Sequence, residues 1–216
     1  MEKQRIVAGC LVAAVLSALA ACAGGPKPTQ QTELLDYKGA ALGISIPAWV
    51  TTYQENEGNL AVEALPEYKD FNCFVVNRES TDKAFLLAWV NNLSGPVAIA
   101  STIATGLSQD VEGRARNIED AEREQMIRTN TEVMINASYT GARKVADWWY
   151  LARNKETKAE SYHAFALYII EKKVLNDHIV RNLQNIADDN AAMSEARRAI
   201  YADLINEIRV NGFSNR

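Results

Sequence analysis

Histidines, the side chains most often used for acid–base and metal chemistry, are few in this sequence. There are two, His163 and His178, and neither is followed at i+2, i+3 or i+4 by a residue type that binds metal ions. Asp177 precedes His178, a pair that could serve a general base but that helix surfaces also expose commonly. No Gly-x-Ser-x-Gly turn occurs. We therefore predict no catalytic residues, no metal and no cofactor, and we expect a protein that is not an enzyme.

The stretch that points to definite chemistry is Leu19-Ala20-Ala21-Cys22. It ends an apolar run that begins at Ile6, just after Lys3 and Arg5. A basic start, a short apolar core and small residues before a cleavage point are typical of a secretory signal. As a helix the run would span about 24 Å, which is short for a bilayer. The alternatives are an uncleaved anchor helix and an ordinary signal cut elsewhere.

The ending at Cys22 resembles the lipobox of bacterial lipoproteins. That resemblance implies a diacylglyceryl group on the Cys22 thiol, cleavage between Ala21 and Cys22, and often a further acyl chain on the new amino group. Two or three chains hold a protein firmly on a membrane. In better-known bacterial lipoproteins an Asp after the cysteine retains the protein in the inner membrane, whereas Ala23 stands here. We expect a cell-envelope protein at the outer membrane, on its periplasmic face or at the surface.

Cysteine usage leaves a single thiol in the body of the protein. Cys10 lies in the predicted signal and Cys22 is the predicted lipidation site, so we expect no disulfide within the chain at Cys73. Its neighbours in residues 71–76 are mostly apolar, which favours a buried thiol packed as a small hydrophobic group. An intermolecular disulfide and a reactive nucleophile are the alternatives.

Composition excludes some classes of partner. Lys and Arg number 23 against 27 Asp and Glu, giving a formal net charge of −4, and no cluster of basic residues stands out. We therefore expect no nucleic acid as a partner. Hydrophobic residues make up 48% of the chain, enough for a substantial core.

Three segments have the composition of strands: residues 71–77, 142–152 and 162–170. Phe165, Leu167 and Ile169 alternate along the last one and so share one face of the sheet. The polar residues 154–160 predict a turn that joins the last two strands in a hairpin.

Helical spacing dominates elsewhere. A helix is expected to begin at residues 80–82 and to end at Gly95-Pro96. Residues 96–138 predict one long helix or two, with Gly113 as a point where it bends or breaks. Residues 172–186 and 194–210 predict two more helices. The expected apolar stripes are Phe85, Ala88, Trp89 and Leu93 in the first helix, and Ala100, Ile103, Ala104, Leu107, Val111, Ala115 and Ile118 in the long segment.

These elements predict one domain of the α+β class. We expect a small, mostly antiparallel sheet with helices packed on one face, a long central helix and a helical C-terminal tail. Gly24, Gly25, Pro26 and Pro28 mark a linker. The expected division is residues 1–21 as signal peptide, 22–36 as lipidated cysteine and flexible linker, and 37–216 as the domain.

Trp148 and Trp149 are the most unusual local feature of the predicted sheet. Neighbours on a strand point to opposite faces. Both side chains could therefore lie in a core, or one could be exposed as part of a surface that binds a partner protein.

Three stretches together resemble the twenty-kilodalton outer-membrane lipoprotein family: residues 74–76, the long helix of 96–138, and the pair 141–149 with 162–170. The likeness covers residues 70 to about 185 and rests on the order strand, helix, hairpin. It implies a small α+β domain and supplies no catalytic residues. This chain departs from it by an extra helix before the long one and by the helical tail.

Two functions remain open on the sequence. The first is a membrane-anchored envelope lipoprotein that acts as a structural or protein-binding component, with envelope proteins as partners and an oligomeric state that the sequence leaves open. The second is a carrier of a lipid-like or other apolar ligand. A carrier needs a large apolar cavity lined by Phe, Trp and Tyr side chains, whereas the first function is compatible with a filled core.

Overall fold

A computed structural model describes residues 32–56, 58–92, 95–189 and 193–214. The predicted signal, residues 1–21, and the predicted lipidation site Cys22 lie outside the described residues. Both therefore stay predictions.

The sheet has four strands, all antiparallel, in the order β1-β3-β4-β2. They are β1 (Thr32–Tyr37), β2 (Phe71–Ser80), β3 (Arg143–Asn154) and β4 (Glu160–Glu171). The predicted hairpin is confirmed as β3 and β4, and both strands are longer than expected. The fold is α+β, as predicted, with a long helix and a C-terminal helix.

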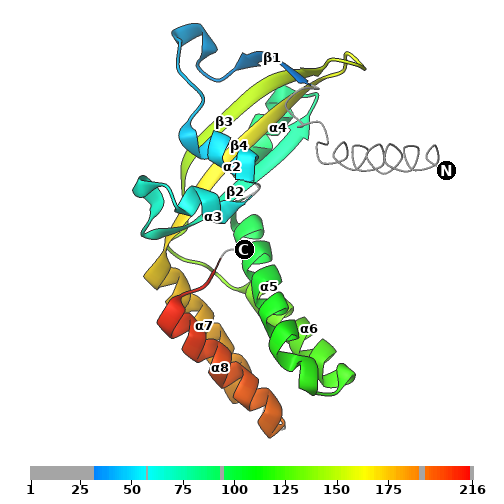
Figure 1. Ribbon diagram of the computed structural model, residues 1–216, viewed down its shortest axis with the longest axis vertical. Coiled ribbons are helices and arrows are strands. Elements are labelled where there is room, and N and C mark those ends of the chain that lie inside the picture. The colour runs from blue at the N-terminus through cyan, green and yellow to red at the C-terminus, as the bar shows by residue number, and fades with distance from the viewer. Residues whose placement is uncertain (1–31, 57, 93–94, 190–192, 215–216) are drawn as a thin grey trace, which may run out of the picture.

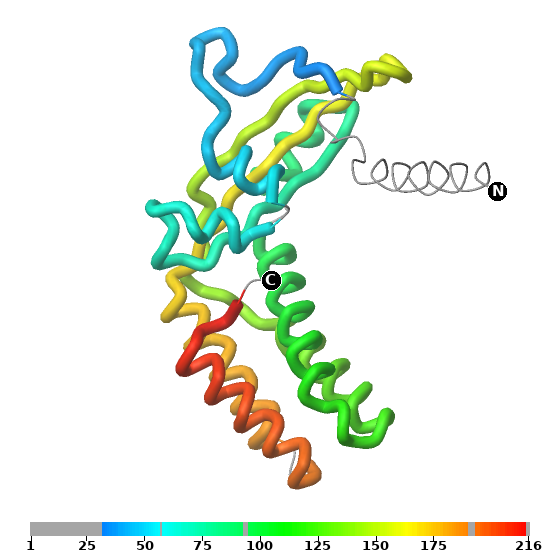
Figure 2. Tube along the Cα trace, viewed as in Figure 1, coloured from blue at the N-terminus to red at the C-terminus, as the bar shows by residue number. Residues whose placement is uncertain are grey.

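The helices form two groups (Figures 1 and 2). One group packs on the sheet, and the other, arranged as two helical hairpins, extends beyond it along the long axis of the molecule. The first group is α2 (Ala48–Asn56), α3 (Asn59–Glu63) and α4 (Lys83–Asn92), with 3-10 turns at Ala40–Leu42 and Pro66–Tyr68. The second is α5 (Gly95–Arg114), α6 (Asp120–Asn136), α7 (Lys172–Asp189) and α8 (Glu195–Asn211).

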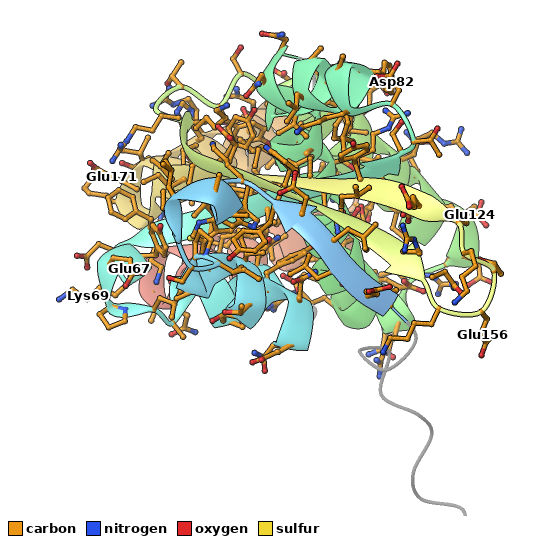
Figure 3. The ribbon with its side chains drawn as sticks, turned by 90° about the horizontal axis from the view of Figure 1, so that it is seen from above. Glu67, Lys69, Asp82, Glu124, Glu156 and Glu171 are labelled. Carbon is orange, nitrogen blue, oxygen red and sulfur yellow. The ribbon has the colours of Figure 1, made fainter. Side chains whose placement is uncertain are left out.

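Both faces of the sheet carry helices, whereas the sequence led us to expect them on one face. Phe165, Leu167 and Ile169 share a face as predicted, but they pack against α2 and α3. The opposite face of β4 packs against α4 and the helical hairpins through Ala164, Ala166, Tyr168 and Ile170. Viewed from above, α4 lies on one side of the sheet and α2 and α3 on the other, while charged side chains such as Glu67, Asp82 and Glu171 project outward (Figure 3). β4 reads as strongly apolar because both of its faces are covered.

Strand β1 corrects the expected domain boundary. Residues 32–36 were assigned to the linker, yet they pair with β3 from Thr32↔Asn154 to Tyr37↔Tyr150. An edge strand is held mainly by backbone hydrogen bonds and needs few apolar side chains, so its sequence carried little signal. The folded domain therefore begins before residue 37.

The segment 96–138 forms two helices, one of the two arrangements that the sequence allowed. The chain reverses through a 3-10 turn at Ala115–Asn117, and Gly113 lies inside α5. The predicted seam is confirmed, since six of its residues from Ala100 to Ala115 are buried and Ile118 packs against the same cluster.

The predicted apolar stripe of α4 is wrong for Phe85 and Ala88, which are exposed, whereas Trp89 packs against the core cluster and Leu93 lies outside the described residues. Leu86 and Val90 are the buried residues, whereas Phe85 is 47% exposed. The Arg78 guanidinium lies 5.1 Å from the Phe85 ring centre and 4.8 Å from that of Trp89. The Phe85 and Trp89 rings therefore both contact the Arg78 guanidinium at the edge of the sheet. Leu86 and Val90, each one position further along α4, face the core.

Within the described ranges no single helix is long and apolar enough to cross a membrane. Taken together as a bent pair, α4 and Gly95–Asn117 have a sufficient length and apolar composition.

Candidate functional site

Trp148 and Trp149 lie on opposite faces of β3, as strand geometry predicts. Trp148 is 4% exposed and packs in the cluster under α2 and α3, with its ring centre 5.9 Å from that of Tyr37. Trp149 is half-buried under α4, where the Lys83 ammonium lies 3.3 Å from its ring centre. Trp148 is therefore removed from the predicted partner surface, because a buried ring cannot meet a partner. Trp149 could still contribute to a partner surface, but the Lys83 ammonium lies against its ring.

The end of α4 nearest the hairpin turn carries a cation–aromatic cluster. Lys83 lies against Trp149 and Tyr162, whose rings contact each other edge to face. Arg78 lies against Phe85 and Trp89. Such contacts are worth about 0.5–1 kcal/mol each at exposed sites. The cluster fastens α4 to the sheet and leaves the Phe85 ring facing solvent.

His163 stands beside a serine and a carboxylate on the other face. Its Nε2 lies 3.1 Å from Ser161 Oγ, and its Nδ1 lies 4.0 Å from Glu79 Oε2. Its ring stacks on Tyr150 with centres 4.7 Å apart. Burial lowers the pKa of His163, and the negative charge of Glu79 only partly opposes this.

The Ser161–His163–Glu79 arrangement is poorly suited to nucleophilic catalysis. A distance of 4.0 Å is too long for the hydrogen bond that orients a catalytic histidine. Ser161 lies within β4 and is paired with Ala152, so the neighbouring N–H groups lie in the plane of the sheet. They cannot point at an oxyanion above the face on which Ser161 stands.

His178 lies on α7 and contacts the loop before β3. Its Nε2 is 2.9 Å from Thr140 Oγ1 and 3.2 Å from Thr140 O, and its ring meets Tyr139 edge to face. Asp177 bonds instead to Lys173. The Asp177-His178 pair is thus an ordinary helix surface rather than a general base with its partner.

Cys73 is buried in β2 between the sheet and α3, as expected for a thiol packed as a hydrophobic group. Burial, assisted by the negative charge of Glu63, raises the pKa of Cys73 to about 12. A thiol with that pKa is almost entirely protonated at neutral pH, so it is a poor nucleophile.

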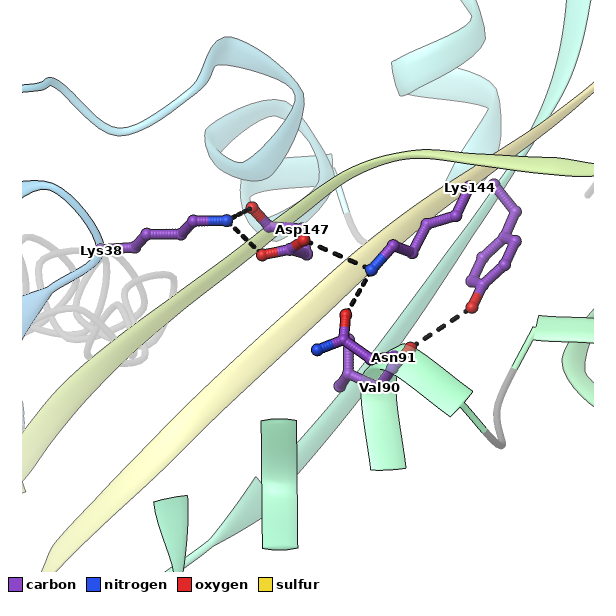
Figure 4. A network of polar contacts seen from close by, with 6 residues as sticks. Lys38, Val90, Asn91, Lys144 and Asp147 are labelled. Atoms are coloured by element: carbon purple, nitrogen blue, oxygen red, sulfur yellow. Dashed lines mark hydrogen bonds and ion pairs between the residues drawn. The ribbon is translucent and has the colours of Figure 1, made fainter. Parts of the chain in front are cut away.

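A polar network crosses the sheet near the bulge in β3 (Figure 4). Asp147 pairs with Lys38 from the segment after β1 and, at 3.3 Å, with Lys144. Lys144 also bonds to Asn91 at the end of α4. Burial alone would raise the pKa of Asp147, but the hydrogen bonds and charges of Lys38 and Lys144 outweigh it and hold the pKa below its ordinary value. The network ties β1, β3 and α4 together.

An open groove runs between α7 and α8, with a volume of about 630 Å³. Its floor is apolar and its walls are mostly charged. The lining residues are Lys173, Asn176, Asp177, Val180, Arg181, Gln184, Ile208 and Arg209. The groove could not be predicted from the sequence, because its residues come from two helices that each have the pattern of an ordinary amphipathic helix. The nearest signal was the row of polar residues spaced three and four apart on α7.

Two smaller hollows lie on the helical hairpins. One, of 280 Å³, is formed by Pro96, Ile99 and residues of the loop before β3. The other, of 360 Å³, lies between α5 and α6. Over the described part of the chain, no group of three or more His, Cys, Asp and Glu residues is arranged to hold a metal ion.

Comparisons with protein-family models, with curated proteins and with solved structures found no match to this chain. The resemblance to the twenty-kilodalton outer-membrane lipoproteins therefore stays a prediction.

Proposed function

We propose that this chain is a membrane-anchored lipoprotein of the bacterial cell envelope that acts, without catalysis, as a structural or protein-binding component. The observation that carries the proposal is Leu19-Ala20-Ala21-Cys22 at the end of a signal-like run, ahead of a folded domain that begins with β1 at Thr32. Residues 22–31 lie between them and would reach at most about 35 Å, so the domain would stay close to the membrane surface. Ala23 after the cysteine supports the outer membrane as its location.

A binding or structural role fits the interior better than the alternative of an apolar-ligand carrier. The two core clusters are filled by side chains on both faces of the sheet. The largest of the hollows described above is open and lined chiefly by charged and polar residues. A carrier of an apolar molecule would need an enclosed and mostly apolar cavity. The geometry around Ser161 and His163 likewise gives no support to an enzyme.

Acyl labelling in the native host tests the anchor. Cys22→Ala should remove the label, because Cys22 is the predicted site of the thioether, and should leave an unprocessed or soluble product on detergent phase partitioning. Cys10→Ala is the matched control, since it changes a cysteine within the signal and should leave labelling intact. Equal labelling of the Cys22→Ala variant would contradict the proposal. Density fractionation then tests the location, and recovery wholly with the inner membrane would contradict the outer-membrane assignment.

A further inference from the structure

A turn between β1 and α2 exposes apolar side chains that do not pack in the domain. It consists of residues 39–44, Gly-Ala-Ala-Leu-Gly-Ile. Leu42 is 80% exposed and Ile44 is 48% exposed, and neither belongs to the two core clusters of the described residues. Residues 39–54 contain no charged side chain. The 39–44 turn is therefore an uncharged apolar projection, and exposed apolar surface of this kind marks a contact with a protein or a membrane.

The backbone of the 39–44 turn is largely satisfied by hydrogen bonds within the turn. Leu42 and Ile44 both donate their N–H groups to Gly39 O, at 2.9 and 3.1 Å. The Gly43 N–H donates to Ala40 O at 3.0 Å. Ile44 lies against Gly39, where an added Cβ would come within 2.9 Å of the Ile44 Cβ, so the turn is closed on itself. These N–H groups need no other acceptor, which lowers the cost of moving the turn out of water.

The 39–44 turn lies at the end of the molecule to which the predicted anchor leads. Figure 1 shows the segment between β1 and α2 at the sheet end, away from the tips of the helical hairpins. Residues 22–31 separate the predicted anchor from Thr32 and could span at most about 35 Å. Gly39 follows Thr32 by seven residues and lies at most about 25 Å from it. The turn can therefore reach the membrane that would hold Cys22, which favours lipid over a protein as its occupant.

We propose that the 39–44 turn inserts into the surface of the membrane that holds Cys22. Leu42 and Ile44 would enter the boundary between the lipid headgroups and the acyl chains. Leu34 on β1, 47% exposed, is a third apolar side chain between the anchor and the turn. A second contact would fix the orientation of the sheet on the membrane, which one point of attachment leaves free. The inference rests on the anchor in the proposed function, and the anchor and the turn give separate signals in the test.

The test is quenching of a fluorescent label on the full lipidated chain in vesicles of phosphatidylethanolamine and phosphatidylglycerol. Ala41→Cys carries the label in the turn, and Val210→Cys, at a 72% exposed site on α8, carries it as the control. Cys73 is buried and Cys22 would be acylated, so only the introduced thiol should react. Nitroxides near the headgroup end of the acyl chains should quench the Ala41 label several-fold more than the Val210 label, because quenching requires contact at the same depth.

Loss of the apolar side chains should abolish the insertion. When Leu42→Gln and Ile44→Gln are added to the Ala41→Cys chain, the quenching should fall to the level of the Val210 label. Leu42→Gln alone should lower it in part. Val97→Gln, at another 72% exposed valine, is the matched control and should leave it unchanged. Melting curves should show that the fold is kept, because substitutions at exposed sites have small effects on stability.

Equal quenching of the Ala41 and Val210 labels would overturn the proposal, and so would quenching that persists in the glutamine double variant. Self-quenching between Ala41 labels that survives dilution with lipid would identify a second copy of this chain as the occupant and would also overturn it. Uptake of label by Cys22 in the unsubstituted chain would instead contradict the anchor, and the insertion with it.

Discussion

Two side chains of α3 serve the backbone of the edge strand β2. Glu63 Oε1 accepts the Cys73 N–H at 2.9 Å, and Asn59 Oδ1 accepts the Val75 N–H at 2.9 Å. Glu63 is 7% exposed and also accepts from Asn72 Nδ2 at 3.3 Å. These contacts occupy donors that an additional strand would otherwise use, and so they protect this part of the edge.

Loss of the Glu63 carboxylate should destabilise the domain. Glu63→Ala removes the carboxylate that accepts the buried Cys73 N–H, at a cost of about 1–3 kcal/mol in the free energy of unfolding. Glu63→Gln keeps an acceptor oxygen of similar reach and should cost less. Urea unfolding of the two variants measures the difference, and equal losses would show that the hydrogen bond to Cys73 is not the cause.

Asp147 should make stability depend on acid pH. Its pKa is lower in the folded state than the ordinary 3.8, because Lys38 and Lys144 stabilise the carboxylate. The network therefore contributes its full stability above pH 3.8 and loses it as the pH falls through the lowered folded pKa. Melting temperatures should show Asp147→Asn to be less stable than wild type at neutral pH, with the gap closing in acid. Glu124→Gln, at an exposed carboxylate on α6, is the control, and a gap that persists unchanged in acid would contradict this account.

The burial of a residue and the sheet face on which it lies were predictable where the local sequence pattern determines them. The buried state of Cys73 and the opposite faces of Trp148 and Trp149 followed from strand composition and alternation. The pairing of Lys38 with Asp147 could not be predicted, since 109 positions separate them in the sequence and only the β1–β3 register brings them together. The Glu63 contact was missed because α3 is a five-residue helix with little periodicity.

At the scale of elements, periodicity predicted the hairpin but not which face of α4 is buried, because that face depends on tertiary packing. The hairpin was predictable because alternation, aromatic content and a polar turn all agreed. In α4 several rotations would put apolar residues on one side, and the structure has the one that buries Leu86 and Val90 and places Phe85 and Trp89 beside the Arg78 guanidinium. Tyr168 contacts the end of α4 and the start of α5: its hydroxyl donates to Val90 O at 3.3 Å, and its ring leaves no room for a Cβ on Gly95.

Alanine substitutions along the hairpin should separate its two faces. Phe165→Ala and Trp148→Ala each open a cavity in the α2–α3 cluster and should cost roughly 3–5 kcal/mol. Trp149→Ala should cost less, because that ring is only half-buried and one of its faces lies under Lys83. Thermal melts give the ranking. A nearly neutral Phe165→Ala would contradict the sheet packing, and equal losses from the two Trp variants would contradict the difference in burial.

At the scale of the whole molecule, the helical hairpins pack on each other and on the end of the sheet. Arg114 of α5 pairs with Asp203 and Glu207 of α8, and the Phe213 ring lies against Gly106 of α5. The described chain starts at the opposite end, where Thr32 pairs with Asn154 beside the hairpin turn (Figure 1). An anchor at Cys22 would therefore attach to the sheet end and leave the α7–α8 groove on the other half of the molecule.

The most direct test of the anchor is the mass of the mature N-terminal peptide from membranes of the native host. A tryptic peptide is expected to run from Cys22 to Lys38, because Lys27 is followed by Pro28 and resists cleavage. Its mass should exceed that of the bare peptide by a diacylglyceryl group, with or without a further acyl chain on the amino group. An unmodified Cys22 within a longer peptide, or a mature chain that begins at another residue, would contradict the account.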